Sequence, residues 1–92
     1  MLRYFYLKGC PYCVYADRAI EELKAEEPRF AAIGIERIEE EDRKDVADLY
    51  DYYYVPTFFE GKRKLFEAHP SNRYEDIKNA LRAIFEECAT EA

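Results

Sequence analysis

Two cysteines separated by two residues stand near the start of the chain, in the stretch Gly9-Cys10-Pro11-Tyr12-Cys13. A short apolar run precedes them, and a helical pattern follows from Tyr12 to about Glu26. The pair therefore belongs at the carboxyl end of a strand and in the first turn of a helix. In a chain with few cysteines, this placement indicates a dithiol that cycles between the reduced and the disulfide form.

The spacing also predicts which cysteine reacts first. If Cys10 is the N-cap, Pro11 takes the first helical position, where its missing N–H costs nothing. The Cys10 sulfur can then accept a hydrogen bond from the backbone N–H of Tyr12 or Cys13. These donors, the positive helix end and the nearby Lys8 all favour the thiolate, so we expect Cys10 to be the nucleophile. Cys13 lies one turn further in and is expected to be more buried, remaining a thiol until Cys10 has been attacked.

A different interpretation of the cysteine pair is half of a zinc site. Tetrahedral zinc takes four ligands, usually from two such pairs or from one pair and two histidines. Only Cys88 and His69 remain in this sequence, and neither has the spacing of a zinc ligand. We therefore expect no metal.

Length and composition restrict the class of protein. The chain has 92 residues, 49% hydrophobic and 16% aromatic, which predicts a single folded domain over residues 1–92. A net charge of −6 argues against nucleic-acid and anionic-membrane partners. No apolar run reaches transmembrane length, and three cysteines do not form the even-numbered framework of an extracellular protein. A cytoplasmic, monomeric protein is expected.

Hydrophobic patterns predict the order β-α-β-α-β-β-α. Strands are expected over residues 2–7, 33–38, 55–59 and 64–67, with a hairpin connection over residues 60–63. The first helix has a core-facing stripe at Ala16, Ala19, Ile20 and Leu23.

Two further helices are expected. The acidic stretch over residues 39–45 opens the second, whose predicted stripe is Val46, Leu49, Tyr50 and Tyr53. The tyrosines of residues 52–54 are interpreted as packing residues in preference to a binding platform. The last helix is predicted to begin with a capping box at Asn72 and Glu75. Its apolar stripe is Ile77, Leu81, Ile84, Phe85 and Cys88, which makes Cys88 a buried core thiol.

Taken with this order of elements, the tetrapeptide Cys10-Pro11-Tyr12-Cys13 and the dipeptide Val55-Pro56 closely resemble a glutaredoxin over about the whole chain. The resemblance implies the thioredoxin-like α/β fold, a four-stranded mixed sheet flanked by three helices, with the first strand inside the sheet. It also implies a cis proline at Pro56 facing the dithiol, and glutathione as the reductant. The glutathione or substrate site that it implies includes Lys8, Tyr12, Val55, Pro56 and Ser71.

The sequence departs from the family at two places. Tyr54 stands where the family usually has threonine, and the segment over residues 67–73 lacks the glycine pair that helps to hold the glutamyl carboxylate of glutathione. Ser71 and Arg73 are the expected substitutes for that turn. We therefore expect glutathione binding that is weaker than in a typical glutaredoxin but not lost.

The predicted activity is thiol–disulfide exchange by Cys10 and Cys13. Expected partners are glutathione and proteins that carry disulfides or glutathionylated cysteines. Two alternatives stay open: a thioredoxin-like disulfide reductase served by a flavoprotein reductase, and a redox-sensing module without turnover. Thioredoxins, however, usually have a buried aspartate on the strand before the dithiol, and residues 2–7 contain no acid.

Overall fold

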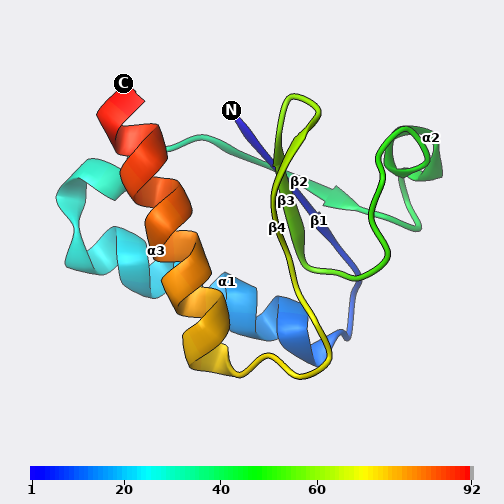
Figure 1. Cartoon of the computed structure of the whole chain (residues 1–92), viewed down its shortest axis with the longest axis horizontal. Helices are drawn as coiled ribbons and strands as arrows, with labels where there is room; N and C mark the ends of the chain where they lie inside the picture. The colour runs from blue at the N-terminus through cyan, green and yellow to red at the C-terminus, as the bar shows by residue number, and fades with distance from the viewer. Residues whose placement is uncertain (92) are drawn as a thin grey trace.

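The computed structural model describes residues 1–91 and contains one four-stranded sheet with helices on both faces (Figure 1). Its elements in chain order are β1 (Leu2–Tyr6), α1 (Pro11–Glu26), the short 3-10 helix η1 (Pro28–Phe30), β2 (Ile35–Glu39), α2 (Lys44–Ala47), β3 (Thr57–Glu60), β4 (Arg63–Glu67) and α3 (Tyr74–Glu91). This order is the predicted one.

The sheet is mixed, and β1 lies in its interior. The strand order is β2-β1-β3-β4, with β1 parallel to β2 and antiparallel to β3. β3 and β4 form an antiparallel hairpin whose turn contains Gly61 at a φ of +59°, a conformation that glycine adopts without strain. The thioredoxin-like α/β arrangement predicted from the sequence is therefore confirmed.

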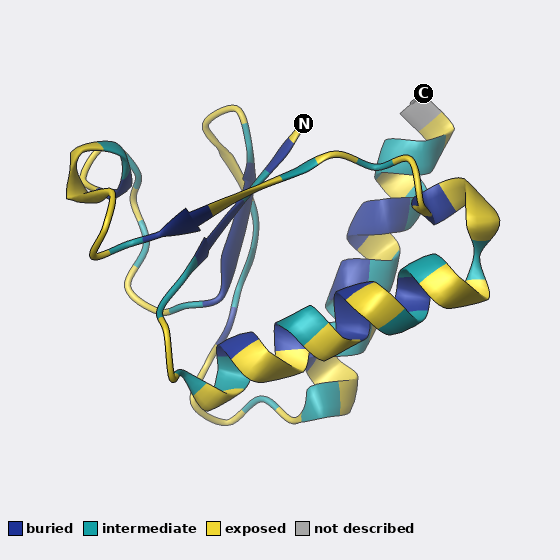
Figure 2. Ribbon diagram, turned by 180° about the vertical axis from the view of Figure 1, so that it is seen from behind, coloured by how far each residue is buried: buried dark blue, intermediate teal, exposed yellow. Residues whose placement is uncertain are grey.

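The side chains of β1 alternate between two hydrophobic clusters. Leu2 and Tyr4 are buried against α1 and α3, whereas Phe5 is buried on the opposite face with Phe59 and Ala47. Figure 2 shows the buried residues along the inward sides of α1 and α3 and along the strands. The two clusters thus pack against both faces of β1, and this packing fixes the point at which the following loop begins.

The predicted stripes of the two long helices are confirmed as core. Those of α1 and α3 are buried at Ala16, Ala19, Ile20, Leu23, Ile77, Leu81, Ile84 and Phe85. Cys88 is an exception, because it is only partly buried at the edge of this cluster. The prediction of a buried core thiol at Cys88 therefore holds only in part, because the side chain packs against the core cluster but stays partly exposed.

The predicted second helix is reduced to a single turn, α2. Leu49 and Tyr53, assigned to its buried stripe, are 67% and 87% exposed. Tyr50 instead leaves helical geometry and packs its ring against Phe5 and Phe59. The aromatic cluster on this face therefore determines the course of the chain after Ala47, and helical periodicity does not. Of the tyrosine run, Tyr52 packs at 5.1 Å from the Phe5 ring, while Tyr53 and Tyr54 are exposed.

Some boundaries also differ from the predictions. The second strand begins at Ile35, because the loop after η1 extends through Gly34, and the third begins at Thr57. The predicted capping box is shifted by one residue: the backbone N–H of Arg73 donates to Asp76 at 2.9 Å. Within residues 1–91, no helix combines the length and the apolar composition that crossing a membrane requires.

Candidate active site

The turn between β1 and α1 presents the first cysteine of the pair. Gly9 has a φ of +80°, the left-handed region in which a side chain would be strained. Cys10 follows as the N-cap with extended backbone angles, and Pro11 begins α1. The backbone N–H of Cys10 donates to the carbonyl of Leu7 at 3.3 Å, which closes the turn. The sequence prediction for this segment is confirmed.

The Cys10 sulfur, however, does not cap the helix. The backbone carbonyl oxygen of Cys10 accepts the first helical hydrogen bonds, from the N–H groups of Cys13 and Val14 at 3.1 Å each. No side-chain cap is formed at Cys10. The thiol instead donates toward the carbonyl of Val55, with 3.8 Å between sulfur and oxygen. The predicted sulfur-to-N–H bond was therefore wrong, because the side chain turns outward to the segment before β3.

Cys13 lies beneath Cys10 and is 3% exposed. Burial is the main cause that raises the pKa of the Cys13 thiol; a hydrogen bond with the Cys10 sulfur and the charge of Asp17 raise it further, against an opposing backbone hydrogen bond at Leu7. Both cysteines are thiols in this structure. A partly exposed thiol in contact with a buried one is what a nucleophile and a resolving cysteine require.

Sequence reasoning missed a polar network behind the buried thiol. The hydroxyl of Tyr4, which is fully buried, lies 3.1 Å from the Cys13 carbonyl oxygen and 2.9 Å from Asp17 Oδ1, and its single proton can be donated to either acceptor. Arg37 Nη1 donates to the same Asp17 oxygen at 2.6 Å. Burial, followed by the charge of Asp17, raises the pKa of Tyr4, so the phenol stays a donor. Asp17 is four residues after Cys13, and residues at this spacing lie side by side on a helix, so the sequence could have placed the Asp17 carboxylate near Cys13.

The segment before β3 meets the dithiol from the other side. The Val55–Pro56 peptide bond is cis, as the resemblance implied. Pro56 is buried, and its carbonyl accepts the N–H of Ala68 at 3.0 Å, which ties the segment to the end of β4. The structure thus brings together Cys10, Cys13, Val55 and Pro56.

The other predicted site residues are arranged less closely. The Lys8 side chain is 73% exposed, and its Nζ lies 3.6 Å from the carboxylate of Asp42. The Tyr12 hydroxyl donates to the carbonyl of Pro70, which joins the dithiol helix to the loop before α3. Ser71 is exposed on that same loop. Lys8 therefore pairs with the acidic loop after β2, whereas Tyr12 connects the dithiol to the neighbourhood of Ser71.

Internal acceptors already use two donors at the start of α3. The N–H of His69 donates to Asn72 Oδ1 at 2.7 Å, and the N–H of Arg73 donates to Asp76 Oδ2 at 2.9 Å. The resemblance puts the glutamyl carboxylate of glutathione near this turn. Both of these N–H groups are thus engaged within the chain, and Asp76 adds a negative charge there.

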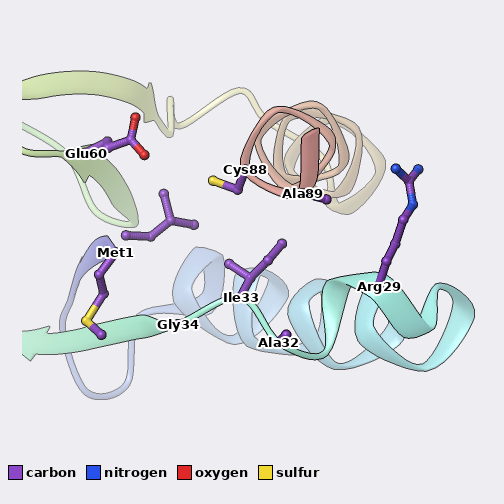
Figure 3. Close-up of a pocket in the computed structure, with 9 residues that line it drawn as sticks. Met1, Arg29, Ala32, Ile33, Gly34, Glu60, Cys88 and Ala89 are labelled. Carbon is purple, nitrogen blue, oxygen red and sulfur yellow. The ribbon is translucent and has the colours of Figure 1, made fainter. Parts of the chain in front are cut away.

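A cavity of about 520 Å³ lies away from these residues, at the amino end of β1 (Figure 3). Met1, Ile33 and Cys88 are among its lining residues, and none of the predicted site residues lines it. Within the described part of the chain, no group of three or more histidine, cysteine or acidic side chains is arranged to hold a metal ion.

Comparison with known proteins supports the fold. No protein-family model matches the chain, and no curated protein matches its sequence. A solved structure described as that of a malarial protein is similar, with a TM-score of 0.59 and 15% sequence identity over 89% of this chain and 92% of that one. At this identity the likeness concerns the fold. What is established is a nearby cysteine pair on a thioredoxin-like α/β scaffold.

Proposed function

We propose that the protein is a thiol–disulfide oxidoreductase of the glutaredoxin type. The observation that carries this proposal is the pairing of a partly exposed Cys10 with a buried Cys13 at the start of α1, opposite a cis proline. A pair that only stabilised the fold would not need one sulfur at the surface beside a backbone carbonyl.

The proposed reaction has two exchange steps. The Cys10 thiolate attacks one sulfur of a substrate disulfide, forms a mixed disulfide and releases the first substrate thiolate. The Cys13 thiol then loses its proton and attacks the Cys10 sulfur, which closes the Cys10–Cys13 disulfide and releases the second substrate thiolate. The substrate gains two electrons and two protons, and the dithiol loses them. Two glutathione molecules return the protein to the dithiol and leave as glutathione disulfide.

A second candidate is a thioredoxin-like reductase that a flavoprotein reductase serves. The engaged N–H groups of His69 and Arg73 favour it, because they reduce the donors available to glutathione. Glutathione binding weaker than in a typical glutaredoxin is expected under the first proposal, for the same reason.

One measurement separates the two candidates. The oxidised protein is mixed with glutathione in one experiment and with a thioredoxin reductase and its reduced cofactor in the other, and the rate of reduction is followed. Faster turnover with glutathione supports the glutaredoxin type, and faster turnover with the reductase supports the second candidate. A Cys10→Ser variant is the control for both. A wild-type protein that neither system turns over refutes an enzymatic role.

A further inference from the structure

The segment that carries Val55 is held by a carboxylate from β4. Glu67 Oε2 accepts the backbone N–H of Tyr53 at 2.5 Å and that of Tyr54 at 2.7 Å. The other oxygen, Oε1, accepts from Lys64 Nζ at 2.8 Å. The Glu67 side chain is only 15% exposed, although the backbone donors that it binds lie at the surface, and hydrogen bonds to an ionised carboxylate are stronger than those between neutral groups.

Further contacts fix the same segment on the far side of Val55. The N–H of Ala68 donates to the Pro56 carbonyl at 3.0 Å, and the Thr57 hydroxyl donates to the Tyr54 carbonyl. Val55 is the residue between these anchor points. Its own carbonyl faces the Cys10 thiol at 3.8 Å. The position of Val55 against the nucleophile therefore depends on the Glu67 carboxylate at one end.

We infer that Glu67 is a positioning residue for the dithiol site. This inference rests on the proposed function and deepens it. The carboxylate fixes the segment that ends at Val55, whose carbonyl faces the Cys10 sulfur, so a polypeptide that brings its disulfide to Cys10 must pass along this backbone. Glu67 touches neither sulfur, so its effect appears in how tightly a peptide disulfide is held.

Tyr53 provides a matched pair of variants. Its ring is 87% exposed, so losing the ring changes little packing. Tyr53→Ala removes the ring and keeps the N–H, whereas Tyr53→Pro also removes the donor to Glu67. We expect Tyr53→Pro to raise KM for a disulfide-linked peptide about tenfold over Tyr53→Ala, with kcat within about twofold. A tenfold change is about 1.4 kcal/mol, close to the low end of what a hydrogen bond to a charged group contributes.

Glu67→Gln tests the same contact from the other side and stays informative if the proline variant does not fold. An amide accepts less strongly than a carboxylate, and its NH₂ group meets the Lys64 ammonium, so we expect the same rise in KM. Lys64→Gln is the control: it keeps both N–H bonds to Glu67, and KM should stay within about twofold of wild type. Hydrogen exchange at the Tyr53 and Tyr54 amides should accelerate in Glu67→Gln.

The outcomes separate the inference from the proposed function. If the wild type is active and KM is unchanged in both Tyr53→Pro and Glu67→Gln, the positioning role of Glu67 is refuted and the proposed function stands. A fall in kcat at unchanged KM also contradicts it, since alignment acts on substrate binding. A wild type that exchanges no disulfide refutes the proposed function and the positioning role with it.

Discussion

Replacing Asp76 with alanine should strengthen the binding of glutathione. In the structure, the Asp76 carboxylate accepts the Arg73 N–H at 2.9 Å and places a negative charge at the start of α3. Asp76→Ala releases that donor and removes that charge. Both changes favour an anion at the helix start, where the helix dipole is positive.

The size of the effect follows from the contact that is exchanged. A hydrogen bond to a charged group contributes about 1.5–3 kcal/mol, and the low end applies because the turn is exposed. Since about 1.4 kcal/mol is a factor of ten, affinity should rise roughly tenfold. The variant should also lose stability, by about 0.5–2 kcal/mol, because Asp76 satisfies a donor at the helix end.

The assay is KM for a glutathionylated peptide, with a denaturant titration to follow stability. Glu75→Ala is the matched control, because it removes the same charge one residue earlier while the Arg73 N–H remains bonded to Asp76. Charge alone is worth about 0.3–1 kcal/mol there, or about two- to fivefold. Equal changes in the two variants, or no change in Asp76→Ala, would refute the reasoning.

Three other changes test the site and its support. Cys10→Ser should abolish exchange and Cys13→Ser should trap mixed disulfides, as gel analysis under non-reducing conditions will show; the opposite pattern would reverse the two roles. Asp17→Asn should lower the pKa of Cys13, because the Asp17 charge raises it, and thiolate absorbance against pH in a Cys10→Ser background measures this. Hydrogen bonding, above all to Tyr74, lowers the pKa of Glu22 from 4.5 to about 2. A lowered carboxyl pKa stabilises the fold above the unfolded value, so this contribution should be lost as pH falls from about 4.5 to 2, and Glu22→Gln should flatten the stability curve in that window.

Local patterns were sufficient to predict much of the fold. β1, α1, the β3–β4 hairpin and α3 each combine a clear hydrophobic period with turn or cap residues, so their existence and order could be read directly. The cysteine pair could be placed because a proline and a strand-to-helix change surround it. The dithiol helix begins at Pro11, as its spacing predicted.

The prediction of a long second helix was wrong because contacts with distant parts of the chain decide the course of this segment. Tyr50 packs on Phe5 and Phe59, and Lys62 Nζ both donates to the Leu49 carbonyl at 2.7 Å and lies 4.1 Å from the centre of the Tyr50 ring. Phe5 and Phe59 lie on β1 and β3, and Lys62 lies in the turn between β3 and β4, so no helical period within residues 44–53 indicates these partners. Tertiary contacts therefore outweighed a four-residue match to a helical stripe.

The polar contacts of the site were the hardest part to foresee. Glu67 reaches Tyr53 and Tyr54 across the space between β4 and the loop before β3, and nothing near Glu67 in the sequence marks that partner. The α3 cap was ambiguous, because Asn72 with Glu75 and Arg73 with Asp76 are neighbouring pairs at the same spacing. Only the fold decides which N–H each carboxylate meets.

The two outer strands of the sheet bear on how copies of the protein behave when crowded. β2 exposes Glu36 and Arg37, and β4 exposes Arg63 and Lys64. Charged side chains on an edge strand disfavour the addition of a strand from a second copy. The charges on both edge strands therefore oppose edge-to-edge aggregation. The dithiol turn can then stay accessible to substrates without an uncharged edge strand that would pair with another copy.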